Sequence, residues 1–181
     1  MPPPSPTPVV LLGNSPRVGK FVAAKLMPEY EGMSEFDSIW RNWLSMLTRG
    51  SPVIHFVSNI DQAKADMSVI MDGGEPPRDP SHVASYNFSQ LPKHIIFGKG
   101  FQWPELQRIR ELPGSEEWGL CWYYAPMPPG SLPPQVPDMS QITDGTLDKQ
   151  TNIIVPNMKR VIDGVVSEGK EGLDGVYSLS K

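Results

Sequence analysis

Residues 9–20 read VVLLGNSPRVGK, the pattern of a buried strand that turns sharply into a helix. The first four residues are wholly apolar, which is typical of a central parallel strand that helices cover on both faces. From Val18 onward apolar residues recur at helical spacing, and Pro28 ends the segment. A strand, a tight turn and a helix in this order favour an α/β fold.

The same alternation continues along the chain, about four times in all. We expect further strands at residues 53–57, 95–97 and 120–124, and helices after Asn59, from Trp103 and over residues 152–166. Strands that alternate with helices form a parallel sheet through right-handed crossovers. The sequence therefore predicts a small doubly wound, Rossmann-like α/β fold of about four strands in the order 2-1-3-4, with helices on both faces.

Composition fits one domain with long irregular parts. The chain has 181 residues, of which 39% are hydrophobic, and this suits a single core. Its 21 prolines and 16 glycines require long loops or tails. We expect a disordered proline-rich tail over residues 1–8, a single domain over residues 9–181 and a proline-rich loop at residues 125–137.

Charge and cysteine usage disfavour several classes of protein. A net charge of −4 omits the basic surface that binding to nucleic acids or anionic membranes requires, so neither partner is expected. The chain has no apolar run near the ~20 residues of a membrane span, and its first residues lack the features of a secretion signal. One cysteine, Cys121, cannot form an internal disulfide, which favours a cytoplasmic location. No metal site is predicted, because His82 and His94 lack further ligands at metal-binding spacing.

The turn at residues 13–19, GNSPRVG, carries the most specific motif. A Walker phosphate loop does not fit, because five residues separate Gly13 from Gly19 and Phe21 follows Lys20. Read as G-x-x-G-x-x-G, the turn resembles the fingerprint of the extended and atypical short-chain dehydrogenase/reductase family, which includes non-catalytic dinucleotide-sensing members. Pro16 departs from that pattern, because the middle glycine normally lets a pyrophosphate approach bare backbone.

The resemblance implies a cofactor, NADP or NAD, at this turn. The candidate binding residues there are Gly13, Asn14, Ser15, Arg17, Gly19 and Lys20. Arg17 and Lys20 would pair with the phosphates, and arginine suits a 2′-phosphate. The alternative is that Gly19 permits close packing of the helix on the sheet while both cations are solvated. The pattern alone leaves both explanations open.

Two further positions are candidates for the same ligand. Ser58 ends the second strand, where a dinucleotide fold presents a polar or acidic residue to the ribose. Lys99 lies between Gly98 and Gly100 after the third strand, and in the predicted strand order it faces residues 13–19 across the ligand crevice. The alternative for Lys99 is a solvated turn.

Residues 32–51 look inserted, because their removal restores the usual spacing between the glycines and the end of the second strand. Phe36, Trp40, Trp43 and Leu47 form an apolar stripe at helical spacing. Such a stripe can pack on the sheet, form a homodimer or enter a groove of a protein partner. The other explanation is a retained intron in the gene model, which sequencing of the transcript would test.

No residue is assigned a catalytic role. Tyr177 and Lys181 match the Tyr-x-x-x-Lys spacing of short-chain dehydrogenases, but glycines precede Tyr177 where that family has a helix. Residues 122–124 either pack in the core or line a ligand pocket. The first hypothesis is a nucleotide-binding-type protein, an NAD(P)-binding oxidoreductase relative or accessory with a degenerate cofactor site. The alternative is a non-enzymatic scaffold that binds a partner through the stripe at residues 36–47.

Overall fold

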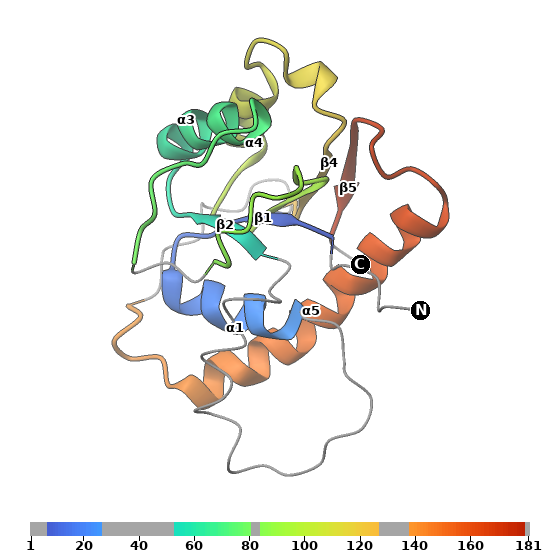
Figure 1. Cartoon of the computed structure of the whole chain (residues 1–181). Coiled ribbons are helices and arrows are strands. Elements are labelled where there is room, and N and C mark those ends of the chain that lie inside the picture. Colours follow the sequence, from blue (N-terminus) through green and yellow to red (C-terminus); the bar gives the residue numbers. More distant parts are fainter. Residues whose placement is uncertain (1–6, 27–52, 81–83, 127–137, 180–181) are drawn as a thin grey trace.

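A computed structural model describes residues 7–26, 53–80, 84–126 and 138–179, and its centre is a parallel sheet (Figure 1). The sheet has five strands in the order β2-β1-β3-β4-β5, and every neighbouring pair is parallel. The strands are β1 (Val9–Leu12), β2 (Val53–Val57), β3 (His94–Phe97), β4 (Cys121–Tyr124) and β5 (Gly175–Ser178). The predicted α/β class and the order 2-1-3-4 are confirmed, with β5 as an additional strand.

Helices cover both faces of the sheet, as predicted. Figure 1 shows α3 and α4 on one face and α1 and α5 on the other. Their bounds are α1 (Pro16–Leu26), α3 (Ile60–Met71), α4 (Trp103–Arg110) and α5 (Asp144–Ser167), with a short 3-10 turn η1 (Ser115–Glu117) before β4.

The strands are buried because each of them sends side chains into two cores. Along β1, Val10 and Leu12 pack toward α3 and α4, whereas Val9 and Leu11 pack toward α1 and α5. The neighbouring strands alternate in the same way, so that Trp122 and Tyr123 of β4 lie in opposite cores and are both fully buried. This two-sided burial explains why the first strand is apolar at every position.

Two elements differ from the sequence-based expectation. The last helix begins at Asp144 rather than Asn152, because Thr143 caps it by accepting a hydrogen bond from the backbone N–H of Thr146. The eight residues 144–151 are mostly polar, and Leu147 and Thr151 are the buried ones among them, so they show little helical periodicity. The fifth strand was missed because it lies at the edge of the sheet: its residues are partly buried or exposed, so no apolar run marks it.

One crossover has an unusual hand. The β1–α1–β2 connection moves one way along the sheet and crosses one face. The β2–α3–β3 and β3–α4–β4 connections move the opposite way and cross the other face. These three crossovers therefore have the same hand. The β4–α5–β5 connection advances in the same direction as α4 but returns on the α1 face, which gives it the opposite hand. The expectation of uniformly right-handed crossovers, the rule in about 98% of cases, does not hold for this connection.

The consequence is that α1 and α5 lie side by side and parallel. Lys25 near the end of α1 contacts Asp148 at 2.6 Å and Asn152 at 2.6 Å, and Arg17 near its start contacts Asp144 at 2.5 Å. Both helices therefore begin at the carboxyl edge of the sheet.

Several expectations lie outside the described residues. They are most of the proline-rich tail (1–6), the whole of the segment 32–51 with Phe36, Trp40, Trp43 and Leu47, most of the loop 127–137, and His82 and Lys181.

Candidate functional site

The candidate site lies at the carboxyl edge of the sheet, where the strand order reverses between β1 and β3. Backbone hydrogen bonds join the three strand ends here: Gly13 N–H donates to Val57 at 3.0 Å, and Gly98 N–H donates to Leu12 at 2.8 Å. In open α/β sheets, ligands bind in the crevice at this kind of reversal. The turns after β1 and β3 therefore form the expected floor of a ligand site.

The amino end of α1 points at this edge, but its own residues engage part of its backbone. Ser15 caps the helix: its carbonyl accepts from Gly19 N–H at 3.0 Å, and its hydroxyl accepts from Val18 N–H at 3.4 Å. Pro16 stands at the first helical position, where its missing N–H costs the helix nothing. An anion at this helix end therefore finds fewer free N–H donors than a glycine-rich turn would offer.

Gly19 has a packing role that the structure shows directly. A Cβ at Gly19 would lie 2.3 Å from Cε2 of Phe56, a buried residue of β2, and one at Gly13 would lie 3.2 Å from the same atom. The helix can approach the sheet this closely only because Gly19 has no side chain. This was one of the two explanations that the sequence left open, and it accounts for Gly19 without a ligand.

The turns after β1 and β3 touch through Asn14 and Gly100. A Cβ at Gly100 would lie 1.9 Å from Nδ2 of Asn14, so the carboxamide occupies the space that the glycine leaves. Asn14 is exposed on its other side. The side chain thus lies across the crevice between the two turns and is the group that a ligand crossing it would meet first.

The three candidate cations have different surroundings. Arg17 is not simply solvated: its Nη2 and Nε donate to Asp144 at 2.5 and 3.1 Å, and its Nη1 donates to the carbonyl of Met139 at 2.7 Å. Lys20 and Lys99 are exposed, and neither forms an ion pair within the described residues. The free positive charge at this edge therefore belongs to the lysines.

Ser58 ends β2 as expected and is half-buried. The polar residues after it are used by the protein itself. Asn59 caps α3 by accepting from Gln62 N–H at 2.8 Å, and Asp61 forms an exposed ion pair with Arg108 at 2.7 Å. Ser58 therefore lies at the same edge as the other candidates, but the nearby carboxylate of Asp61 pairs with Arg108 instead.

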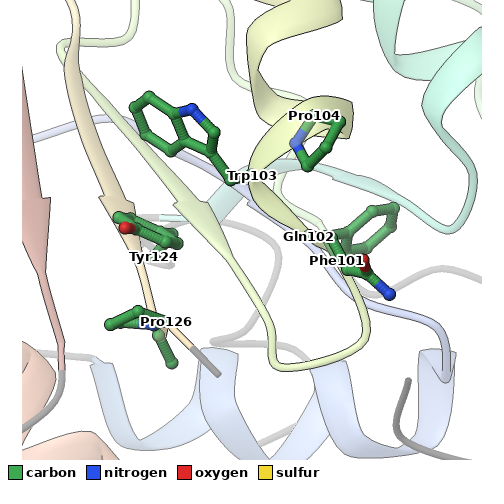
Figure 2. Close-up of a pocket in the computed structure, with 7 residues that line it drawn as sticks. Phe101, Gln102, Trp103, Pro104, Tyr124 and Pro126 are labelled. Atoms are coloured by element: carbon green, nitrogen blue, oxygen red, sulfur yellow. The ribbon is translucent and has the colours of Figure 1, made fainter. Parts of the chain in front are cut away.

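A pocket of about 290 Å³ opens at the same edge, between the turn after β3 and the end of β4 (Figure 2). We call it the β3–β4 pocket; its lining residues are Phe101, Gln102, Trp103, Pro104, Tyr124, Ala125 and Pro126. The rings of Trp103 and Tyr124 lie 5.2 Å apart between centroids, tilted by 46°, and both are partly buried. No charged side chain is among these lining residues, so the pocket suits a neutral, largely apolar group.

Sequence reasoning missed this pocket, except that it considered residues 122–124 as a pocket wall. Tyr124 fulfils that role, whereas Trp122 and Tyr123 are core residues. The signal for the other wall was present in Trp103-Pro104, an aromatic residue and a proline at a helix start directly after a strand. None of the candidate cofactor-binding residues named from the sequence lines the pocket.

A second polar group lies at the opposite, amino edge of the sheet. Nδ1 of the fully buried His94 accepts from the Tyr123 hydroxyl at 2.9 Å, and its Nε2–H donates to Glu171 at 3.2 Å. Lys93 contacts the same carboxylate at 3.0 Å. This arrangement satisfies the neutral imidazole and ties the loop after α5 to β3.

Burial controls the protonation of this group. It lowers the pKa of His94 and raises the pKa values of Tyr123 and Cys121. For Glu171, burial acts to raise the pKa, but the hydrogen bonds from Lys93 and His94 outweigh it and the pKa is lowered. Neutral His94, Tyr123 and Cys121 next to an ionised Glu171 form a structural polar cluster rather than a reactive one, and Cys121 is a core residue as expected.

Two other expectations can be compared with the structure. His55 is a packed core residue, as predicted, and its Nε2 lies 2.9 Å from the carboxylate of buried Asp66. Tyr177 lies in β5 and stacks on Tyr123 with ring centroids 5.4 Å apart, so it is not on a catalytic helix.

Within the described ranges, no helix combines the length and apolar character that crossing a membrane requires. Comparisons with protein-family models, with curated proteins and with solved structures gave no match.

Proposed function

We propose that this chain is a nucleotide-binding protein of the Rossmann-like type, which holds its ligand at the carboxyl edge of the sheet. The observation that carries the proposal is that three features share the carboxyl edge: the amino end of α1 and the exposed Lys99 at the strand-order reversal, and the β3–β4 pocket next to it. A helix start and a lysine favour a phosphate, and an uncharged aromatic pocket favours a ring.

The proposed cofactor remains NADP or NAD, bound as in an oxidoreductase relative or accessory. The described residues supply no acid–base pair at this edge, so the proposal assigns binding and no catalytic step. Arg17 would reach a 2′-phosphate only after it leaves Asp144 and Met139, which favours NAD over NADP in this conformation. A cytoplasmic location and association through Phe36, Trp40, Trp43 and Leu47 are further parts of the proposal.

Thermal unfolding of the purified chain with millimolar NADH, NADPH and ATP tests the proposal. A ligand at 100 times its Kd adds about 2.7 kcal/mol of stability, which corresponds to a rise of about 5–10 °C in a domain of this size. Lys99→Glu should abolish most of the rise by repelling the phosphate. Lys149→Glu is the matched control, because it makes the same charge change on an exposed residue of α5 that, like Lys99, forms no ion pair within the described residues.

Unchanged melting temperatures with all three nucleotides would contradict the proposal. That result would favour the scaffold alternative, in which Pro16 and the Asn14–Gly100 contact mark a fold without a ligand.

A further inference from the structure

We infer that the ligand is a mononucleotide, with its single heteroaromatic ring in the β3–β4 pocket and its phosphate toward the turn after β1. This inference rests on the nucleotide binding in the proposed function and replaces its dinucleotide with a smaller ligand. It differs from the dinucleotide that the glycine pattern implies, and the reasons are the size, the chemistry and the position of the pocket.

The pocket has room for one ring system. Its volume of about 290 Å³ is just below the range of roughly 300–1,000 Å³ that holds drug-sized ligands. Figure 2 shows Trp103 and Tyr124 next to each other, and their ring centroids are 5.2 Å apart, so the two rings form one aromatic wall of the pocket. Partly buried aromatic rings offer a contact surface to a planar base, and such contacts are tolerant of which base is present.

The pocket also lies next to the part of the carboxyl edge where the phosphate would bind. Phe101 of the pocket wall directly follows Gly100, and Gly100 is the residue against which Asn14 packs. Lys99 precedes it and is exposed. A ligand with its ring in the pocket therefore has its phosphate directed to the side of the edge that carries the lysine and the start of α1.

The other half of a dinucleotide would lie over the end of β2, and that region is poorly prepared for it. Asn59 is used to cap α3, and Asp61 pairs with Arg108, so of these three polar residues after β2 Ser58 is left to meet a second ribose. Arg17, the group best suited to a second phosphate, is held by Asp144 and Met139. These contacts favour a ligand confined to the β3 and β4 side.

The test compares ligands that carry one or both halves. Calorimetric titrations of the full chain would use AMP, nicotinamide mononucleotide, NADH, NADPH and ribose 5-phosphate. We expect at least one mononucleotide to bind within about threefold of the better dinucleotide. We expect Trp103→Ala to weaken that mononucleotide about tenfold or more, the effect of losing a base–aromatic contact, while ribose 5-phosphate binds as before.

Trp118→Ala is the matched control, because Trp118 is also partly buried against the same core but lies before β4 at the amino edge. Since Trp103→Ala also removes core packing, a second measurement uses the unaltered chain: the indole N–H resonance of Trp103 should shift on titration with the mononucleotide, and that of buried Trp122 should not.

The outcomes distinguish failure of the mononucleotide inference from failure of the proposed nucleotide binding. Binding of NADH or NADPH more than about 30-fold tighter than either mononucleotide would overturn the inference and leave nucleotide binding intact. An unmoved Trp103 resonance at saturation would also overturn it, because the ring would then lie elsewhere. No binding of any nucleotide would overturn the proposed function and the inference together.

Discussion

Replacing Gly19 with alanine should destabilise the protein, although alanine is the better helix former. A Cβ at this position would lie 2.3, 2.8 and 3.0 Å from three ring atoms of Phe56, and Phe56 is 1% exposed, so the ring has nowhere to move without disturbing the core. Overpacking of this kind costs about 1–3 kcal/mol. Helix propensity returns up to about 1 kcal/mol. The expected net loss is therefore about 0–2 kcal/mol, toward the upper end because the closest contact is only 2.3 Å.

The chain provides its own control in Gly164, a helical glycine of α5 around which a Cβ would meet no atom within 4 Å. Gly164→Ala should stabilise the protein by about 0.5–1 kcal/mol, because only the propensity gain operates there. Urea unfolding followed by circular dichroism would measure both free energies of unfolding at the same pH.

A double-mutant cycle locates the cause. In Phe56→Leu the ring atoms that crowd Gly19 are gone, so Gly19→Ala should become neutral or stabilising in that background. The reasoning would be refuted if Gly19→Ala stabilised the parent chain as much as Gly164→Ala does. It would also be refuted if Phe56→Leu left the effect of Gly19→Ala unchanged, since the penalty would then come from another contact.

Three further predictions follow from the described contacts. Asp144→Asn should free Arg17 at a cost of less than about 1 kcal/mol, because the pair is exposed; if nucleotides bind, NADPH affinity should then rise relative to NADH affinity in paired titrations. Stability should fall between pH 7 and pH 5: burial lowers the pKa of His94, so the unfolded chain, with a His pKa near 6.5, binds more protons than the folded chain as the pH drops. The lowered pKa of Glu171 adds a further loss of stability below about pH 4.5. Urea unfolding of His94→Gln, whose side chain keeps a hydrogen-bond donor and an acceptor, should show a free energy of unfolding that changes less between pH 7 and pH 5. The Cys121 thiol, fully buried and with a raised pKa, should react with a thiol reagent no faster than the chain unfolds, and reaction within seconds in native buffer would contradict the described packing.

The order of the sheet was predictable because parallel strands buried on both faces are apolar throughout. Residues 9–12 and 53–57 stand out for this reason, and the helices between strands fix the topology. The start of α5 and the strand β5 were harder to predict from the sequence. The start of α5 is set by the Thr143 cap and by tertiary contacts rather than by an apolar pattern, and β5 is an edge strand of partly buried or exposed residues that shows none.

The candidate site was predictable in position but not in detail. The turn after β1 does lie at the strand-order reversal, yet periodicity says nothing about contacts between residues 127 positions apart, such as Arg17 with Asp144. The aromatic run at 122–124 shows the same limit. Which of its three residues lines a pocket depends on how the neighbouring elements pack, and Tyr124 does so because it ends β4 and packs on Trp103 at the start of α4.

The opposite-handed β4–α5–β5 connection also affects the order in which the two faces of the sheet are covered during synthesis. During synthesis, α3 and α4 emerge soon after the strands that they cover, so one face of the sheet can close early. The other face receives α1 early but waits for α5, which follows the first four strands in the sequence. Until then Ile96 and Tyr123 are without part of their cover. A ribosome-bound chain stalled before residue 144 should therefore expose an apolar surface that chaperones recognise.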